Sequence, residues 1–252
     1  EPMRLTITYL SYSQIETFRL CPLHYKLRYI LGIPTPPTPA LSFGTTMHTV
    51  MRQWYERVAA KEKIDKTALL KLLADNWIRQ GYTSKPYEQE MKKRGERYLL
   101  SYFEKQYQPD TKILTLEQPF AVPITSGGKN IRIGGKIDRI DELANGKIEI
   151  IDYKTGRIPT KREVDGNTQL SMYAIAASEI AESAFYRKVE DIVLTLYFFD
   201  TQEKFSTTRS ISQLAEEKAQ IISVAEAIET SDFHCSGNQL CAICEYHLFC
   251  DA

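Results

Sequence analysis

Two aspartates and one lysine lie near the ends of two consecutive apolar stretches. Asp138 is near the end of the first stretch, and Asp152 and Lys154 end the second. If both stretches are β-strands, the two-residue period of a strand puts Asp152 and Lys154 on the same face. A turn signal at 145–146 folds the first strand back beside the second, which brings Asp138 toward the pair. We therefore expect two carboxylates and one ammonium group to converge.

Such a cluster suits phosphodiester hydrolysis. Two carboxylates can hold Mg²⁺ or Mn²⁺, the metal polarises the phosphate and activates a water, and the ammonium steadies the water or the developing charge. An ordinary Asp-Lys ion pair beside a solvated Asp138 is the alternative, and these three residues do not decide between the two. Further acid-x-Lys tripeptides occur at 90–92, 110–112 and 216–218. The first and last of these lie in helical patterns, where residues two apart diverge, and the second lies in a loop.

The chain has five cysteines, an odd number: Cys21, Cys235, Cys241, Cys244 and Cys250. All except Cys21 lie close to the end of the chain. A chain of this length does not need disulfides, so metal or redox chemistry is the better expectation. Zinc sites usually pair two Cys-x-x-Cys units. A single such unit, a five-residue gap and one remote thiolate form a looser set, which iron-sulfur clusters accept. Cys235 is interpreted as a spare thiol, although it could compete with Cys241.

The elements that must position these residues follow from hydrophobic periodicity. Helices are predicted at Ser11–Leu31, with Pro22 as a potential break, and at Phe43–Ala60, 65–80, 86–107, 167–181 and 212–229. Alternating patterns predict strands at 112–124, 130–141, 147–153, 191–199 and 204–209. Turn signals at 127–128 and 145–146 make the first three strands a meander. The sequence therefore predicts an α/β fold whose first hundred residues are helical.

Composition limits the classes of protein that fit. The chain has 252 residues, 43% of them hydrophobic, which is enough for a real core. Lys+Arg and Asp+Glu balance at 32 each, so a polyanion would need a local cationic patch. No apolar run reaches the length of a membrane span, and no signal peptide opens the chain, so we expect a cytoplasmic protein. Glu1 and Pro2 before Met3 suggest either a remnant of cloning or the cut edge of a longer polypeptide.

Taken together, these motifs resemble those of the PD-(D/E)xK nuclease superfamily, in its RecB-like branch with an iron-sulfur cluster. The resemblance rests on segments spread along the chain: Ser11 to Pro22, Phe43-Gly44-Thr45-Thr46-Met47-His48, Gly135 to Asp141, Ile151 to Gly156, Gln169 with Tyr173, and Cys241 to Cys250 together with Cys21. Residues 61–107 carry no motif of the family.

The resemblance implies a restriction-endonuclease-like mixed sheet core flanked by helices. It implies a helical portion at 1–110, a nuclease core at 111–230 and an iron-sulfur segment at 231–252, all in one integrated nuclease domain. The metal ligands would be His48, Asp138, Asp152 and the backbone carbonyl of Tyr153. Catalysis would use Asp138, Asp152, Lys154, Gln169 and Tyr173, and a [4Fe-4S] cluster on Cys21, Cys241, Cys244 and Cys250 would clasp the two ends of the chain.

The implied activity is that of a metal-dependent DNA nuclease using Mg²⁺ or Mn²⁺, an exonuclease on single-stranded DNA in repair or recombination. A helicase domain or subunit is the implied partner, and a non-catalytic DNA-binding module of a helicase-nuclease complex is the alternative. DNA contacts are expected from Arg157, Lys161 and Arg162, which directly follow the strand of Lys154. Glu117 lies where some superfamily members keep an extra acid, but we expect a solvated strand glutamate there.

Overall fold

The computed structural model describes residues 5–250, apart from the side chains of Gln239 and Leu240. Residues 37–119 and 136–210 form the larger of two compact units, and residues 5–36, 120–135 and 211–250 form the smaller. The long strands β2 (Lys112–Ser126) and β3 (Lys129–Glu142) each contribute to both units.

The larger unit is built on a mixed sheet. The second half of β3 pairs antiparallel with β4 (Ile148–Lys154), β4 pairs parallel with β5 (Ile192–Phe198), and β5 pairs antiparallel with β6 (Glu203–Thr207). Gly146 takes a φ of 79° in the tight β3–β4 turn, a conformation that favours glycine. The parallel pair needs a crossover, and α6 (Lys161–Asp165) and α7 (Thr168–Glu179) provide it, followed by the short 3₁₀ turn η2 (Val189–Asp191).

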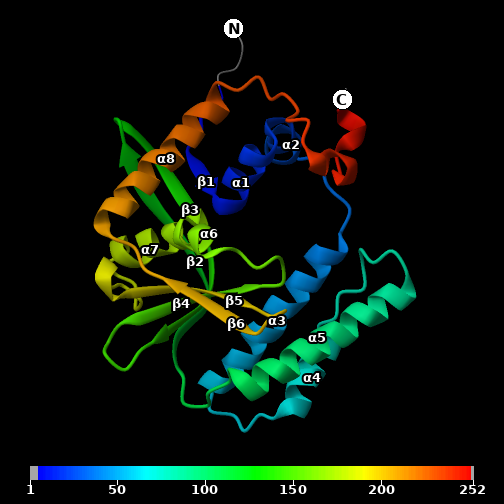
Figure 1. Ribbon diagram of the computed structural model, residues 1–252. Helices are drawn as coiled ribbons and strands as arrows, with labels where there is room; N and C mark the ends of the chain where they lie inside the picture. The colour runs from blue at the N-terminus through cyan, green and yellow to red at the C-terminus, as the bar shows by residue number, and fades with distance from the viewer. Residues whose placement is uncertain (1–4, 251–252) are drawn as a thin grey trace. The chain divides into compact units, whose positions relative to one another are not determined.

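Three helices pack together in the larger unit: α3 (Pro39–Ala59), α4 (Lys66–Asp75) and α5 (Lys85–Lys105) (Figure 1). Each begins at a residue whose side chain accepts a backbone N–H, which satisfies one of the free donors of a helix start. Their apolar faces share one core with Ile151 and Tyr153 of β4. Because side chains alternate along a strand, Asp152 points to the opposite face, where α7 lies.

The smaller unit begins with β1 (Tyr9–Ser11), which pairs parallel with the first half of β3. Ser11 and Gln14 form a reciprocal capping box that starts α1 (Tyr12–Leu20). The chain then continues through α2 (Pro22–Tyr25) and the π-helical segment η1 (Lys26–Ile30). The predicted single helix at Ser11–Leu31 is therefore interrupted at Cys21, because Pro22 has no N–H to continue the hydrogen-bond ladder.

Helix α8 (Ile211–Glu229) of the smaller unit runs beside α1 (Figure 1). Its last residue, Glu229, accepts a hydrogen bond from the backbone of Ile7 at 2.7 Å and pairs with Lys129. Beyond α8, the chain forms two short 3₁₀ turns, η3 (Gln239–Ile243) and η4 (His247–Phe249). Residues 230–250 thus contain no long regular element.

The α/β class with a mixed sheet and flanking helices is confirmed, and each predicted helix and strand overlaps an observed one. The sequence does not predict the short elements β1, α6, η2, η3 and η4, since three to five residues do not establish a periodicity. Among the described residues, no helix combines the length and the apolar character needed to cross a membrane.

Candidate active site and thiol cavity

The predicted strand carboxylates and the lysine converge in the larger unit. Asp152 is 2% exposed on β4, and its Oδ2 lies 2.6 Å from the ammonium of Lys154 on the same face. Asp138 of β3 is also buried, and its Oδ2 accepts a hydrogen bond from the backbone N–H of Tyr153 at 2.9 Å. The backbone of β4 thus places Asp138 next to the Asp152–Lys154 pair.

Gln169 and Tyr173, one turn apart on α7, complete a ring of polar contacts around that pair. The ammonium of Lys154 donates to Oε1 of Gln169 at 2.7 Å, and Nε2 of Gln169 donates to the Tyr173 hydroxyl at 2.8 Å. The Tyr173 hydroxyl lies 2.8 Å from Oδ1 of Asp152, to which it donates. Both Asp152 and Lys154 are therefore held in one orientation by the same two side chains of α7.

His48 reaches the same region from α3. Its Nδ1 lies 3.1 Å from Oδ2 of Asp138, and its side chain is 33% exposed. Neighbouring residues of α3, Phe43, Met47 and Met51, are buried in the helical core, which fixes the helix against the sheet. His48 is thus on the side of α3 that lines a cavity together with Asp138.

The electrostatics of the site reflect a surplus of negative charge. Burial and the neighbouring charge of Asp152 raise the pKa of Asp138, although contact with His48 opposes the rise. Burial would lower the pKa of His48, but the hydrogen bond and charge of Asp138 outweigh it and leave the pKa raised. Burial and both aspartates raise the pKa of Tyr173 well above its ordinary value. A cation placed between these groups would relieve this repulsion.

The donor set fits a divalent metal. Carboxylate oxygens are the usual ligands of Mg²⁺ and Mn²⁺, and one imidazole nitrogen favours Mn²⁺. His48 and Asp138 offer such atoms from two different elements, and Asp138 accepts a hydrogen bond from the backbone N–H of Tyr153, the residue after Asp152. The sequence-predicted ligands therefore gather in one region.

The side chain of Glu117 is less exposed than the sequence predicts. The strand pattern predicts a solvated glutamate, but the side chain is only 17% exposed and forms an ion pair with Lys136. One ligand atom each from His48, Glu117 and Asp138 lie within 4.8 Å of one another. The reason is local: Glu117 has a φ of 49°, so β2 departs there from the regular alternation on which the expectation rests.

A buried arginine supports the site from the other face of β4. The guanidinium of Arg139 lies 3.6 Å from the ring centroid of Tyr55, and its Nε donates to Asp141 at 2.8 Å. Its Nη1 donates to the Tyr153 hydroxyl at 3.1 Å, which holds the residue between Asp152 and Lys154. The sequence alone does not indicate this role, because Arg139 and Asp141 stand there only as parts of a longer motif.

The expected DNA-contacting cations lie on or before α6, next to the strand of Lys154. Arg157 pairs with Glu163, and Lys161 donates to Asp165 at 2.6 Å. Arg162 is exposed on the same helix. Exposed ion pairs of this kind contribute little to stability, so a phosphate could replace the acidic partners.

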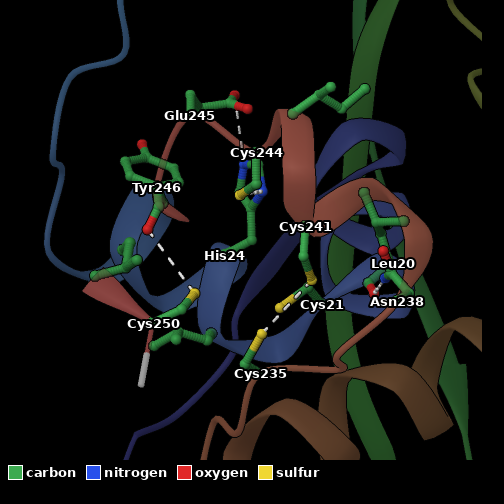
Figure 2. A pocket seen from close by; sticks show the side chains of 13 residues that line it. Leu20, Cys21, His24, Cys235, Asn238, Cys241, Cys244, Glu245, Tyr246 and Cys250 are labelled. Atoms are coloured by element: carbon green, nitrogen blue, oxygen red, sulfur yellow. Dashed lines mark hydrogen bonds and ion pairs between the residues drawn. The ribbon is translucent and has the colours of Figure 1, made fainter. Parts of the chain in front are cut away.

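All five cysteines line one cavity of about 170 Å³ in the smaller unit (Figure 2). The sulfur atoms of Cys235 and Cys241 lie 4.0 Å apart, and that of Cys244 lies 3.9 Å from Nδ1 of His24. Several hydrogen bonds join the C-terminal segment to the N-terminal segment, including one from the Tyr246 hydroxyl to the carbonyl of Ile33 at 2.5 Å. The segment's position is thus set by contacts other than the thiols.

The thiols influence one another's ionisation. Burial and the contact with Cys235 raise the pKa of Cys250 to about 11. The backbone N–H of Gly237 and the neighbouring thiols lower the pKa of Cys235. A cavity crowded with sulfur from both ends of the described chain fits a soft metal or an iron-sulfur cluster. Cys235, interpreted as spare, lies in the same cavity as the other four.

The chain is similar to known proteins. The family model of the PD-(D/E)XK nuclease superfamily matches residues 9–251. The chain is 30% identical over 211 residues to a subunit of an ATP-dependent helicase/deoxyribonuclease from Carboxydothermus hydrogenoformans, a match that covers 69% of this chain and 19% of that protein. It is 29% identical over 182 residues to the protein of the same name from Clostridium tetani, covering 59% of this chain and 15% of that one.

An uncharacterized protein from Rickettsia bellii is 27% identical over 165 residues, which covers 62% of this chain and 20% of that protein. The chain therefore spans about a fifth of the length of this relative. The solved structure of SSO0001 aligns with 91% of this chain and 94% of its own, at 18% identity and a TM-score of 0.39.

Proposed function

We propose that this chain, which belongs to the PD-(D/E)XK nuclease superfamily, is a metal-dependent deoxyribonuclease that acts as an exonuclease on single-stranded DNA. The observation that carries the proposal is the ammonium of Lys154, which lies 2.6 Å from Asp152 and 2.7 Å from Gln169. A lysine fixed between a buried carboxylate and an amide is preorganised for charge that develops beside it.

Each residue of the site would have a defined task. His48, Asp138, Asp152 and the carbonyl of Tyr153 would hold Mg²⁺ or Mn²⁺. The bound cation supplies Lewis-acid polarisation of the phosphate and a water of lowered pKa. Lys154 would orient the attacking water and stabilise the charge that develops on the phosphate.

Gln169 and Tyr173 would act on the reaction through their contacts with Lys154 and Asp152. Gln169 accepts from Lys154, and Tyr173 donates to Asp152, so neither partner can turn away without losing a hydrogen bond. Such support keeps catalytic groups within a fraction of an ångström of their working positions. Arg157, Lys161 and Arg162 would contact the phosphates that flank the cleaved bond.

Cys21, Cys241, Cys244 and Cys250 would hold a [4Fe-4S] cluster that clasps the ends of the chain. Support comes from their common cavity and from the loose spacing of the ligand set. The names of the Carboxydothermus and Clostridium relatives favour a helicase domain or subunit as a partner. We place the activity of such an assembly in repair or recombination. The match covers only 19% and 15% of the length of those two proteins. The helicase partner would therefore correspond to parts of such an assembly outside the matched region.

A cleavage assay tests the activity. Single-stranded DNA labelled at either end, end-blocked DNA and circular DNA would be incubated with Mg²⁺, Mn²⁺ or a chelator. We expect metal-dependent loss of linear strands and protection of circular ones. Cleavage of circular DNA would show that the activity is that of an endonuclease and not of an exonuclease. DNA binding without cleavage at any metal concentration would favour the alternative, a non-catalytic module of a helicase-nuclease complex.

Replacing His48 by alanine should raise the Mn²⁺ concentration needed for half-maximal cleavage by about tenfold or more, because a nitrogen ligand is lost. The protein should stay folded and keep its cluster, since the thiols belong to the other compact unit. Mn²⁺ titrations of cleavage beside melting curves provide the measurement.

His234, whose side chain is 83% exposed, offers a matched histidine control. His234→Ala should change neither the Mn²⁺ requirement nor the melting temperature. If His48→Ala lowers the melting temperature but leaves the Mn²⁺ requirement unchanged, His48 is a structural residue and the ligand set reduces to Asp138, Asp152 and Tyr153.

A further inference from the structure

One face of α3 carries more polar groups than the proposed metal site uses. The side chains on this face follow one another mostly at intervals of three or four residues: Leu41, Thr45, His48, Thr49 and Arg52. All five line one cavity of about 550 Å³. Cavities that bind small molecules have volumes of roughly 300 to 1,000 Å³, and a single ion occupies much less. The cavity therefore has room for a nucleotide beside a bound cation.

Arg52 is the cation on this face of α3. Its Nη1 donates to Oε1 of Glu56, one turn further along the helix, at 2.6 Å. The two side chains are 35% and 49% exposed, and an exposed pair within one helix contributes little to stability. Glu56 can therefore turn into solvent and leave the guanidinium to a phosphate. The guanidinium fork binds phosphate oxygens through two parallel hydrogen bonds.

The position of Arg52 relative to His48 suits the repeat of a nucleic-acid strand. His48 contacts Asp138 at 3.1 Å and so lies at the proposed metal site. Arg52 follows four residues later, which corresponds to a rise of about 6 Å along the helix axis. Neighbouring phosphates of an extended strand are separated by a similar distance. A strand with one phosphate at the metal site would thus bring the next phosphate close to Arg52.

We propose that Arg52 binds the phosphate next to the cleaved one, so that the exposed face of α3 guides the DNA strand past the metal site. This inference rests on the proposed function, because it takes a phosphate held near His48 and Asp138 as its starting point. The Thr49 hydroxyl, on the same face, would donate to the same strand. Glu56 would oppose binding, since its carboxylate occupies Arg52 and repels phosphate.

Fluorescence anisotropy of labelled single-stranded DNA in a chelator measures the affinity without cleavage. Arg52→Ala should weaken binding about tenfold and lower the slope of log affinity against log salt by about one. Arg52→Lys should recover part of the affinity, because it keeps the charge without the fork. Glu56→Gln should strengthen binding about threefold, because it removes a negative charge that competes with the phosphate.

Arg94 and Glu90 of α5 provide a matched control. They form the same kind of pair four residues apart, at 3.7 Å, with side chains 41% and 63% exposed, and they do not line this cavity. Arg94→Ala and Glu90→Gln should each leave the affinity for DNA within about twofold of the parent. Melting curves identify any variant that fails to fold.

Methylphosphonate substitution locates the contact on the strand. Each substrate carries one uncharged methylphosphonate in place of a phosphate, at successive positions beside the cleaved bond. Single-turnover cleavage in Mn²⁺ at low protein concentration is then compared between the parent and Arg52→Ala. At the neighbouring position, the substitution should slow the parent about tenfold and the variant much less, as in a double-mutant cycle.

Two results would overturn the inference. One is an unchanged affinity and salt slope in Arg52→Ala, and the other is an equal methylphosphonate effect in parent and variant at every position. If Arg52→Ala fails to fold, unchanged affinities in both Arg52→Lys and Glu56→Gln overturn it instead. A parent that cleaves DNA while these results are found keeps the proposed function without this contact. A parent that neither binds nor cleaves single-stranded DNA overturns the proposed function and the inference with it.

Discussion

Lys154→Ala should abolish cleavage while leaving DNA binding intact. A preorganised charged group that acts in the transition state contributes about 3 to 4 kcal/mol, which corresponds to a loss of roughly a hundred- to thousandfold in rate. In the ground state the contacts of the ammonium include the protein side chains of Asp152 and Gln169. Its removal should therefore affect the rate constant for cleavage far more than the affinity for DNA.

Single-turnover cleavage and fluorescence anisotropy on the same DNA separate those two quantities. Lys204→Ala provides a control, because this lysine also lies near a carboxylate of the sheet, that of Glu149 at 3.9 Å, but outside the proposed site. A melting curve shows whether loss of the contact with Asp152 has unfolded the larger unit. Cleavage by Lys154→Ala within about tenfold of the parent would mean that another group performs this role.

The strand alternation that predicts this site is informative because it is a local property. Asp152 and Lys154 share one face of β4, and Ile151 and Tyr153 share the other, as a two-residue period requires. The turn at 145–146 then determines the pairing of β3 with β4, which brings Asp138 into place. These features depend on residues close in sequence, so a single sequence can predict them.

Glu117 illustrates what a local pattern misses. The position of its side chain depends on a φ of 49°, in the left-handed region. A glutamate in the sequence does not predict such an angle. The contact with Lys136 depends in turn on how β2 lies against β3. The expectation of a solvated glutamate follows the average behaviour of strand residues, and that average fails where a strand is irregular.

The ring formed by Gln169 and Tyr173 is only partly predictable. Their four-residue spacing places both side chains on one face of a helix, as observed. That this face meets Asp152 and Lys154 is a consequence of the crossover between β4 and β5, since α7 lies within that connection. The sequence thus identifies the residues, and the tertiary structure identifies their partners.

Cys235, in the smaller unit, is another residue whose surroundings the sequence does not predict. Spacing alone separates it from the Cys-x-x-Cys-x₅-Cys pattern, yet its sulfur lies 4.0 Å from that of Cys241 (Figure 2). Backbone contacts such as the hydrogen bond from Leu23 to the carbonyl of His234, at 3.3 Å, hold this part of the chain against α2. Proximity of this kind follows from folding and is independent of ligand spacing.

The thiol cavity gives the second large expected effect. Protein purified without oxygen should be brown, with a broad absorbance near ~400 nm from thiolate-to-iron charge transfer. Cys241→Ala and Cys250→Ala should each lose the colour and much of the stability. Linking Cys21 to Cys250 closes a loop of more than two hundred residues, for which chain entropy alone predicts a stabilisation of about 5 kcal/mol.

That value describes only the entropy that the link removes from the unfolded chain, and native contacts such as the hydrogen bond between Tyr246 and Ile33 act in addition to it. Cys235→Ala is the matched control and should keep both the colour and the melting temperature. Iron, sulfide and zinc contents, measured beside denaturant unfolding of each variant, give the readout. If Cys235→Ala loses the colour and Cys241→Ala retains it, Cys235 is the cluster ligand in place of Cys241. A colourless parent protein with one zinc per chain would mean that the thiols bind zinc and not an iron-sulfur cluster. Such a zinc site could still link the two ends of the chain through its thiolates.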